Sequence, residues 1–358
     1  MFHVKQNNVL KGSSDQVSSV AFSPFYKNLL ANGSWDNIVR LWDIERKVQI
    51  AALKGHTYPV FSVAFSPFYK NLLASGGNDS TIILWDIKTK VQIEVLKGHI
   101  NHVRYVAFSP FNKNLLASAS RDHTIILWDI KTKVQIAVLE GHTHSVWSVA
   151  FSPFHKNLLV SGSLDNNVIL WDFKTKVQIA VLKGHTDEVY SVAFSPFQKN
   201  LLASGSWDKT IILWDIKTKV QIAVLKGHAS LVWSVAFSPL NKNLLASGSH
   251  DKTIILWKIV KKKKSKRIRI KIKAVLKGHT KRVNYIAFSP LKRNLLASAS
   301  YDSTIILSDI KPVTYPTRYI KIKKVLVSFL LCLQKLNVYH FKANNLKMII
   351  RRFLIESY

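Results

Sequence analysis

The sequence contains very little sulfur, with one cysteine (Cys332) and two methionines among 358 residues. A single cysteine excludes a disulfide framework and is typical of a reducing compartment. Long apolar runs are also absent: the first ten residues lack the apolar core of a signal peptide, and Ser328 and Gln334 interrupt the longest apolar stretch near the C-terminus. We therefore expect no secretory signal and no membrane span, and an intracellular location in the cytoplasm or nucleus.

Acidic residues are scarce as well, with 20 Asp and Glu against 52 Lys and Arg, which gives a formal net charge of +32. Much of this charge lies in two segments. Residues 258–273 carry ten basic residues and no acid, and residues 310–358 carry ten against Glu356. The first segment contains a cluster that we call the basic insert: Lys261, Lys262, Lys263, Lys264, Lys266, Arg267 and Arg269.

A unit of 43 residues is repeated along most of the chain, and its length decides the architecture before any local pattern does. Trp-Asp begins at Trp42, Trp85, Trp128, Trp171 and Trp214, and Trp257-Lys258 keeps the same spacing. Gly-His follows it at Gly55, Gly98, Gly141, Gly184 and Gly227. The seventh unit arrives eight residues late, with Gly278-His279 and Ser308-Asp309.

Each unit encodes four short strands. In the second unit, β-branched and aromatic runs at 60–65, 72–75, 81–85 and 91–95 are separated by Ser-Pro, Gly-Gly-Asn-Asp and Lys-Thr-Lys turns. This pattern predicts a small antiparallel sheet, and no segment keeps a helical period in all copies. Because a lone sheet of this size leaves both faces in water, stacking of the sheets around an axis is the favoured arrangement.

Gly-His, Ser-Gly-Ser-x-Asp and Trp-Asp in this order strongly resemble the WD-repeat family, over residues 2 to about 310. The resemblance implies an all-β, seven-bladed propeller of four-stranded antiparallel blades over residues 1–310. Residues 4–12 align with the fourth strand of the unit, so we expect the N-terminus to close the last blade. Residues 319–327 resemble the same strand and remain an alternative. Residues 311–358 form a basic extension, with apolar residues at helical spacing near its end (Leu346, Ile349, Ile350, Phe353, Leu354). It is either a short amphipathic helix, which could lie on a membrane surface or in a partner's groove, or a poorly ordered or decayed continuation of the array.

Serine, histidine and aspartate recur in every good unit, which invites comparison with a hydrolase. The resemblance implies instead a buried hydrogen-bond network inside each blade, in which Asp accepts from His, His bonds Ser, and Ser accepts from the Trp indole. Its members are His56, Ser75, Asp79, Trp85; His99, Ser118, Asp122, Trp128; His142, Ser161, Asp165, Trp171; His185, Ser204, Asp208, Trp214; His228, Ser247, Asp251, Trp257. An enzyme needs one active site, whereas this constellation is copied around a ring. We expect no catalysis, no metal and no cofactor, since His99-x-x-His102 and His142-x-His144 lack a third ligand.

Two units depart from this pattern. The first has Ser13 in place of the histidine and Asn32 in place of the serine, and the seventh has Ser308 in place of the tryptophan. Both flank the expected closure of the ring. Terminal repeats are often atypical, so we expect this seam to be the weakest part of the ring.

Two positions vary between otherwise nearly identical copies. The residue before the turn aspartate, here called the turn set, is Trp35, Asn78, Arg121, Leu164, Trp207, His250 and Tyr301. The residue after the first valine of each unit, here called the strand set, is Ser18, Phe61, Arg104, Trp147, Tyr190, Trp233 and Asn284. The resemblance implies that both lie on the top face around the central channel. Because Trp, Tyr and Arg dominate interface hot spots, we expect a protein or peptide to bind there; packing between blades and neutral drift are the alternatives.

Lysines repeat on the opposite, bottom face. One occupies the first loop of units one to six, where the seventh unit has Arg293, and two occupy the third-to-fourth strand turn of units two to five. A solvated basic face is the ordinary interpretation; a surface for nucleic acid, anionic lipid or acidic protein tails is the other. The sequence thus predicts a monomeric, non-enzymatic scaffold or adaptor within a multi-protein complex. The alternative function is nucleic-acid or anionic-surface binding through the bottom face and the basic insert.

Overall fold

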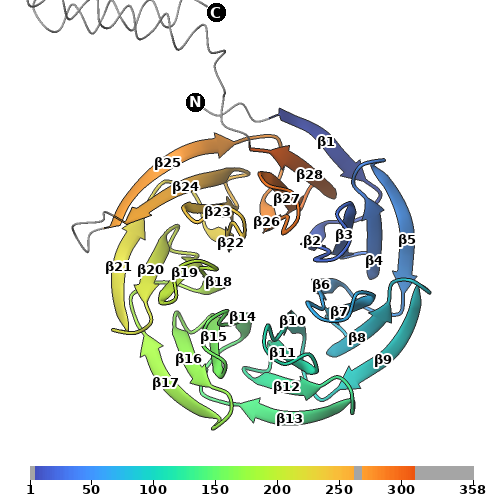
Figure 1. Cartoon of the computed structure of the whole chain (residues 1–358), viewed down its shortest axis with the longest axis horizontal. Coiled ribbons are helices and arrows are strands. Elements are labelled where there is room, and N and C mark those ends of the chain that lie inside the picture. The colour runs from blue at the N-terminus through green and yellow to red at the C-terminus, as the bar shows by residue number, and fades with distance from the viewer. Residues whose placement is uncertain (1–4, 262–267, 311–358) are drawn as a thin grey trace, which may run out of the picture. The chain divides into compact units, whose positions relative to one another are not determined.

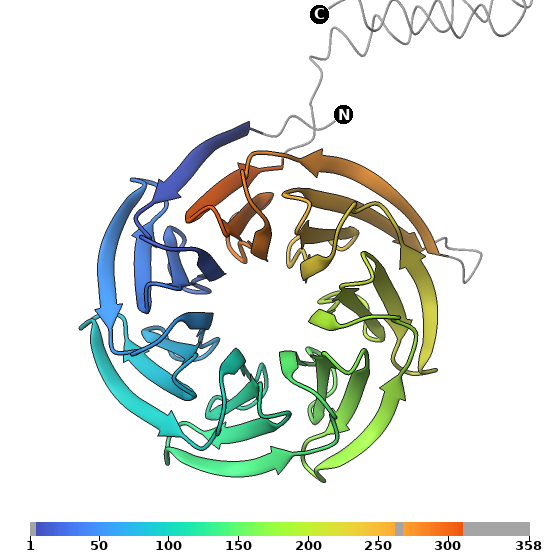
Figure 2. The same cartoon turned by 180° about the vertical axis from the view of Figure 1, so that it is seen from behind.

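A computed structural model describes residues 5–261 and 268–310, which form seven four-stranded sheets around a central axis (Figure 1). Seen from behind, the same ring of sheets surrounds the axis (Figure 2). Neighbouring strands within each sheet are antiparallel, and six of the sheets follow the order of the chain from the inner to the outer strand. The prediction of an all-β, seven-bladed propeller is confirmed.

The blades are numbered along the chain. Blades one to three comprise β2 (Val17–Phe22), β3 (Leu29–Ser34), β4 (Ile38–Asp43) and β5 (Val48–Lys54); β6 (Val60–Phe65), β7 (Leu72–Gly77), β8 (Thr81–Asp86) and β9 (Val91–Lys97); β10 (Val103–Phe108), β11 (Leu115–Ser120), β12 (Ile125–Asp129) and β13 (Val134–Leu139). Blades four and five comprise β14 (Val146–Phe151), β15 (Leu158–Ser163), β16 (Val168–Asp172) and β17 (Val177–Leu182); β18 (Val189–Phe194), β19 (Leu201–Ser206), β20 (Ile211–Asp215) and β21 (Val220–Leu225). Blades six and seven comprise β22 (Val232–Phe237), β23 (Leu244–Ser249), β24 (Ile254–Lys261) and β25 (Ile268–Leu276); β26 (Val283–Phe288), β27 (Leu295–Ser300), β28 (Thr304–Asp309) and β1 (Lys5–Lys11).

The hydrophobic core lies between blades rather than within one of them. The cluster between blades three and four, for example, joins Leu127 and Ala117 of blade three to Val149, Leu159 and Trp171 of blade four. The second and third strands are buried along most of their length because another blade covers each of their faces. Burial on both faces explains why these strands read as continuous apolar runs instead of alternating.

Serine side chains also link the first strands of adjacent blades. Ser62 Oγ accepts a hydrogen bond from Val106 N of the next blade at 3.2 Å, and Ser148 Oγ accepts one from Val192 N at 3.2 Å. Equivalent bonds join Ser19 to Val63, Ser191 to Val235 and Ser234 to Ile286. Five of the seven junctions therefore carry this serine hydrogen bond in addition to the apolar core.

The N-terminal strand closes the ring, as predicted. Strand β1 pairs antiparallel with β28, with Val9 opposite Ile306 and Leu10 opposite Ile305. Leu10 is buried among Val17 and Leu30 of blade one and Leu307 of blade seven, so it contributes to the core of the seam. The alternative closing strand at 319–327 and the extension at 311–358 lie outside the described residues.

The eight-residue insertion lengthens the outer hairpin of blade six. The pairing of β24 with β25 continues past the end of the usual unit, with Lys258 opposite Lys271 and Val260 opposite Arg269. Arg269 and Lys271 are exposed on this extension. The remaining side chains of the basic insert, from Lys261 to Arg267, lie outside the described part of the chain.

Candidate protein-binding face

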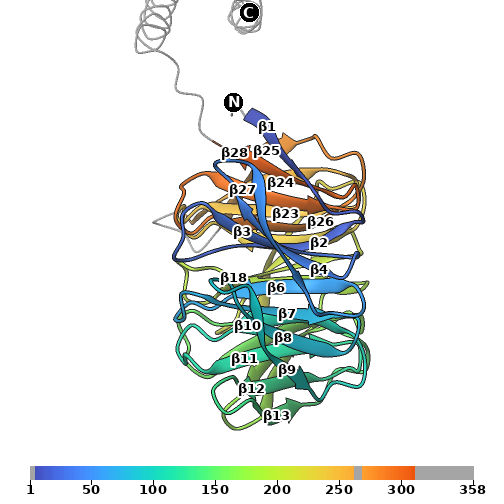
Figure 3. The same cartoon turned by 90° about the vertical axis from the view of Figure 1, so that its right-hand side faces the viewer.

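The two faces of the ring carry different turns. Because consecutive strands run in opposite directions, the second-to-third strand turns share one face with the loops that enter each first strand. We call this the top face. The first-to-second and third-to-fourth strand turns share the bottom face. Seen edge-on, the strands run from one face to the other (Figure 3).

A chain of hydrogen bonds runs from the top face into the core of blades two to six. In blade three, His99 Nδ1 lies 2.7 Å from Asp122 Oδ2 and His99 Nε2 lies 2.7 Å from Ser118 Oγ. Trp128 Nε1 donates to the same Ser118 Oγ at 2.8 Å. Distances of 2.7–2.8 Å recur in His56, Ser75, Asp79, Trp85; His142, Ser161, Asp165, Trp171; His185, Ser204, Asp208, Trp214; His228, Ser247, Asp251, Trp257.

Every polar group of this chain has a partner of the right kind. The indole N–H donates to the serine, the serine hydroxyl can donate to Nε2, and the imidazole then carries its proton on Nδ1 and donates to the aspartate. The imidazoles of these five blades are at most 1% exposed. A substrate therefore has no access to the serine hydroxyl, and the arrangement holds the blade together.

The glycine of Gly-His belongs to the same packing. A Cβ atom at Gly98 would lie 2.8 Å from Cη2 of Trp128, the tryptophan of its own blade. No side chain larger than hydrogen fits there unless the indole moves, which explains the residue type at this position.

Blade one replaces this network with an ion pair. Asp36 has no histidine partner because Ser13 occupies that place; instead, Arg40 Nη2 lies 2.7 Å from Asp36 Oδ2. Arg40 stands where the other six units have isoleucine, is 5% exposed, and also donates to Gln49 Oε1 at 3.1 Å. Trp42 Nε1 donates to Asn32 Oδ1 at 2.6 Å. A different set of residues thus satisfies the aspartate and the indole.

Blade seven keeps the upper half of the network. His279 lies 2.9 Å from Asp302 and 2.8 Å from Ser298, three residues that the sequence analysis did not include. The missing indole leaves Ser308 Oγ buried without a hydrogen-bond partner among the described residues. Relative weakness of the seam stays a prediction.

Acid is expected to destabilise the ring through these aspartates. Burial raises the pKa of Asp79, but the hydrogen bonds that His56, Thr81 and Thr57 donate to the carboxylate outweigh it and lower the pKa to about 2. The pKa of Asp208 is about 2 for the same reasons, with His185 as partner, and those of Asp122, Asp165, Asp251 and Asp302 are also lowered. A carboxyl whose folded-state pKa is lowered stabilises the fold above its unfolded-state pKa, about 3.9, and this contribution is lost as the pH falls through the folded-state value.

The melting temperature should therefore change little from pH 7 to pH 5 on account of these groups and fall steeply between about pH 4 and pH 2. Calorimetry across this range measures it. Asp79→Asn/Asp208→Asn should show a shallower fall because two of the titrating groups are gone. A melting temperature that is constant down to pH 2 would contradict the assignment.

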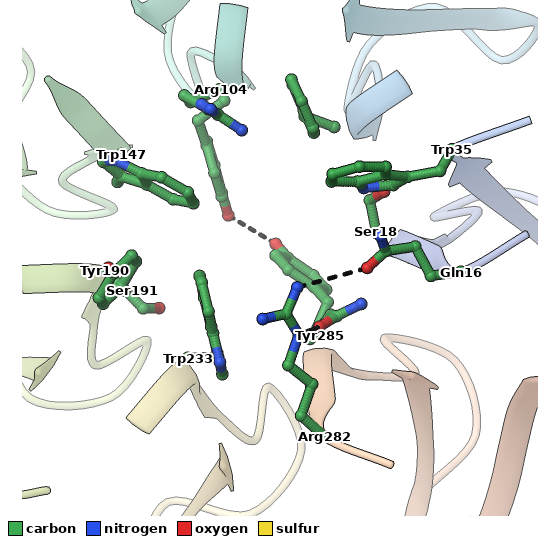
Figure 4. Close-up of a pocket in the computed structure, with 13 residues that line it drawn as sticks. Gln16, Ser18, Trp35, Arg104, Trp147, Tyr190, Ser191, Trp233, Arg282 and Tyr285 are labelled. Carbon is green, nitrogen blue, oxygen red and sulfur yellow. Dashed lines mark hydrogen bonds between the residues drawn. The ribbon is translucent and has the colours of Figure 1, made fainter. Parts of the chain in front are cut away.

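The strand set converges on one pocket at the top of the central channel. All seven of its members line this pocket, one from each blade (Figure 4). The cavity measures about 100 Å³. Pockets for drug-sized ligands occupy roughly 300–1,000 Å³, so this one has room for the ends of one or two side chains.

Aromatic rings form one wall of the pocket. The ring centroids of Trp147 and Trp233 are 5.6 Å apart, and Tyr190 lies 4.7 Å from Trp147 and 4.3 Å from Trp233. On the other side, Trp35 meets Phe61 edge-on at 6.0 Å. The indole N–H groups of Trp147 and Trp233 are buried and have no hydrogen-bond partner among the described residues. The wall thus offers an apolar aromatic surface.

Arg104 lies between two of these rings. Its guanidinium carbon is 4.1 Å from the ring centroid of Phe61 and 4.3 Å from that of Trp147. Burial, together with the charge of Arg121, lowers the pKa of Arg104 to about 10, so the group remains a cation at neutral pH. Arg282, which lies over Trp233 at 4.9 Å, also lines the pocket. Within the described part of the chain, no carboxylate lies within ion-pair distance of either arginine.

Two tyrosines form the floor of the pocket. Tyr105 of blade three and Tyr285 of blade seven reach across the channel, and their hydroxyls are 2.6 Å apart. Burial raises the pKa of both phenols, so they stay neutral. The same two residues also line a second cavity of about 560 Å³, which lies among the Ser-Pro turns, so the pair separates the top of the channel from the bottom.

The turn set surrounds this pocket and, apart from Trp35, does not line it. Trp207 is 43% exposed and lies 5.8 Å from Tyr190, and Tyr301 is 39% exposed beneath Arg282, at 4.6 Å. Asn78, Arg121, Leu164 and His250 lie at the equivalent turns and are not brought into the pocket. In all seven blades, the backbone N–H of the turn residue donates to the loop before the first strand, so the set is held in place.

Sequence reasoning missed five pocket residues: Gln16, Tyr105, Ser191, Arg282 and Tyr285. A signal for four of them was present. The position before the first valine also varies between copies, and Gln16 and Arg282 occupy it in units one and seven. The position two residues after that valine is serine in five units and tyrosine only at Tyr105 and Tyr285. Where tyrosine replaces serine, the side chain enters the channel instead of bonding the next blade.

Within residues 5–261 and 268–310 no helix is long and apolar enough to cross a bilayer. The same residues contain no group of three or more His, Cys, Asp or Glu side chains that could hold a metal ion.

Comparison with protein-family models places the repeat among known domains. A model described as "WD domain, G-beta repeat" matches residues 4–43, 47–86, 176–215, 219–258 and 270–309, more than half of the 358 residues. A model described as "EIPR1 beta-propeller" matches residues 82–171. No curated protein matches the chain with significance.

Proposed function

We propose, from the premise that the chain belongs to the WD-repeat family of β-propellers, that it is a scaffold or adaptor that docks a peptide or protein segment on its top face. WD-repeat propellers generally mediate protein–protein interaction and are generally non-enzymatic. The observation that carries the proposal is the pocket on the top face, which the strand set forms from residues that vary between blades, with only tryptophan occurring twice.

The size and the wall of the pocket favour a protein ligand. A volume of about 100 Å³ admits side-chain ends rather than a cofactor. Trp147, Tyr190 and Trp233 offer the aromatic surface that carries most of the binding energy at protein interfaces. Trp35 and Trp207, about two fifths exposed, extend this surface outward from the channel. A short segment crossing the top face would insert one residue and lie against the others.

Arg104 and Arg282 favour an acidic residue in the inserted position. A half-buried cation without a counter-ion is unfavourable, and the chain pairs its buried arginine, Arg40, with Asp36. Arg104 differs from Arg40 in having no such carboxylate among the described residues. Phe61 and Trp147 cover the two faces of the guanidinium, so its edge is what remains for a planar carboxylate.

Trp147→Ala/Trp233→Ala should weaken binding of a docked segment by at least about 100-fold, since each hot-spot truncation removes about 2 kcal/mol or more. The ligands are 12-residue peptides selected from a random display library on the wild-type chain, and their dissociation constants are then measured by titration. Arg104→Gln should remove the preference for Asp or Glu at one peptide position.

Phe154→Ala/Leu240→Ala is the matched control, because it truncates two similarly exposed side chains of the same two blades on the bottom face. It should leave peptide binding unchanged. Selection of no peptide, or equal binding to the wild type and the tryptophan variant, would refute the proposal.

A second function is favoured by the lysines of the bottom face, which are exposed in the first loop and the third-to-fourth strand turn of blades two to five. With the basic insert, they would bind nucleic acid or another anionic surface. A pull-down experiment tests this. Neutralising Lys261–Lys264 should reduce the recovery of partners whose binding is lost at high salt, whereas Trp147→Ala/Trp233→Ala should reduce the recovery of partners bound to the top face.

A further inference from the structure

We infer that the bottom face docks on the anionic surface of a lipid bilayer, through a ring of apolar side chains that enters the headgroup layer and a ring of cations beside it. This inference deepens the second function proposed above and does not depend on the top face. Its basis is a regularity that neither function accounts for: every first-to-second strand loop presents an exposed apolar residue and, two positions later, an exposed cation.

The apolar ring has one member per blade, each between 39% and 47% exposed: Phe25, Phe68, Phe111, Phe154, Phe197, Leu240 and Leu291. The cation ring accompanies it, and all seven of its members are exposed: Lys27, Lys70, Lys113, Lys156, Lys199, Lys242 and Arg293. Large exposed aromatic and aliphatic side chains are unusual in such number on one face and mark an interaction surface.

These loops are fixed in shape before any partner arrives. In blade three, Ser109 Oγ accepts hydrogen bonds from Phe111 N at 3.2 Å and from Asn112 N at 3.1 Å. The same serine cap holds the loop in all seven blades, at 2.9–3.4 Å. Preorganised loops lose little conformational entropy on docking.

The charge of this face is basic throughout the blades with regular turns. In blade three, Lys131 and Lys133 are exposed in the third-to-fourth strand turn, next to Asp129. Asp129 Oδ1 accepts hydrogen bonds from the backbone of Lys131 and Thr132, so part of its hydrogen-bonding capacity is used within the turn. Blades two, four and five repeat this arrangement. An anionic leaflet attracts each lysine near its surface.

The composition of the apolar ring favours a bilayer over nucleic acid. Single-stranded nucleic acid binds through bases stacked on aromatic faces, and Leu240 and Leu291 have none. Leucine and phenylalanine serve equally well as apolar contacts at a membrane interface. A ring of similar contacts around one axis also fits an extended surface better than a single strand, which follows one path.

Binding is measured by sedimentation of the full chain with vesicles of phosphatidylcholine that contain about one third phosphatidylserine. Each basic residue near such a surface raises the affinity for the vesicles by about tenfold or less. Lys70→Gln/Lys113→Gln/Lys156→Gln should weaken binding by about 100-fold. Phe68→Ser/Phe111→Ser/Phe154→Ser, which changes no charge, should weaken it by about 10-fold or more. Lys54→Gln/Lys97→Gln/Lys183→Gln removes the same charge from exposed ends of fourth strands and should change it less than about threefold.

Insertion is tested directly with a polarity-sensitive fluorophore on a single cysteine in a Cys332→Ser background. The label at Phe111→Cys should shift to shorter wavelength when vesicles are added. The label at Ile100→Cys, a residue 90% exposed in a top-face loop, should not. Equal shifts at both sites, or an unaffected phenylalanine variant, would overturn the inference.

A single-stranded RNA titration separates this inference from the broader function. If the wild type binds RNA but not vesicles, the anionic-surface function stands and the bilayer assignment is wrong. If it binds neither, both are wrong. Vesicle binding that depends on the lysines and on the phenylalanines, with weaker RNA binding, is the expected result.

Discussion

Leu10→Asp is expected to destabilise the propeller by at least about 4 kcal/mol, because it places an unpaired carboxylate in the core of the ring seam. Leu10 is 2% exposed and packs with residues of blades one and seven. The strand that carries it, β1, precedes blade one in the chain and forms the outer edge of blade seven, so its hydrogen bonds to β28 close the ring. Displacement of this strand would expose β28 and the core of the seam together. The decrease in the free energy of unfolding should therefore exceed that of one buried side chain.

Val9→Asp is the control for this substitution. Val9 is the neighbouring residue in the same strand, but its side chain points to the opposite side and is 42% exposed. It should change the free energy of unfolding by about 0.5 kcal/mol or less. Urea unfolding followed by tryptophan fluorescence measures both. Similar stabilities of the two variants would mean that β1 is dispensable for closure.

The architecture could be predicted from the sequence because the same four-strand unit recurs seven times. Trp-Asp and Gly-His fix the boundaries of each blade, and the alignment of residues 4–12 with a fourth strand identified the closing strand. A propeller has few alternatives once the unit is known, since each sheet must bury both faces against its neighbours. The fold therefore depends on the pattern and not on any one residue.

The candidate site could be predicted only in part, for a geometric reason. The strand set and the turn set both vary, but only the first converges on the channel, because its members lie on the innermost strands. Sequence variation alone does not show how far a residue is from the axis. The Tyr105–Tyr285 contact joins residues 180 positions apart, and no local pattern reveals which two units face each other across a ring.

Blade one shows a second limit. The sequence shows that Ser13 and Asn32 replace the histidine and serine of the network. It does not show that Arg40 compensates for the missing histidine, because Arg40 occupies an ordinary strand position. Only the structure shows that its guanidinium reaches the aspartate that the missing histidine would have bound. A lost network residue therefore does not by itself identify a weak blade.

Asp122→Ala is expected to produce the second large loss of stability, about 3–5 kcal/mol, because four donors, among them the buried His99 imidazole, lose their acceptor at once. Asp122 accepts hydrogen bonds from His99 at 2.7 Å, from Ile100 N at 3.1 Å, and from Thr124 through its backbone N at 3.0 Å and its Oγ1 at 2.7 Å. One carboxylate thus holds the loop that enters the blade, the turn after it and the imidazole. Without it, His99 Nδ1 keeps only a longer contact with Thr124 Oγ1, at 3.4 Å, and the bond of His99 to Ser118 weakens as well.

Asp187→Ala is the matched control on the top side of another blade. Among the described residues, the Asp187 carboxylate accepts a hydrogen bond only from the backbone N of Glu188, at 2.9 Å, and the bond that Ser206 donates to the Asp187 carbonyl does not need the side chain. The substitution should change the free energy of unfolding by about 0.5 kcal/mol or less. Urea unfolding gives the total effect, and native-state hydrogen exchange shows where it acts. Protection should fall most in β11 and β12, which carry Ser118 and Trp128. A loss below about 1 kcal/mol would mean that water replaces the carboxylate and that the network contributes little to holding the blade.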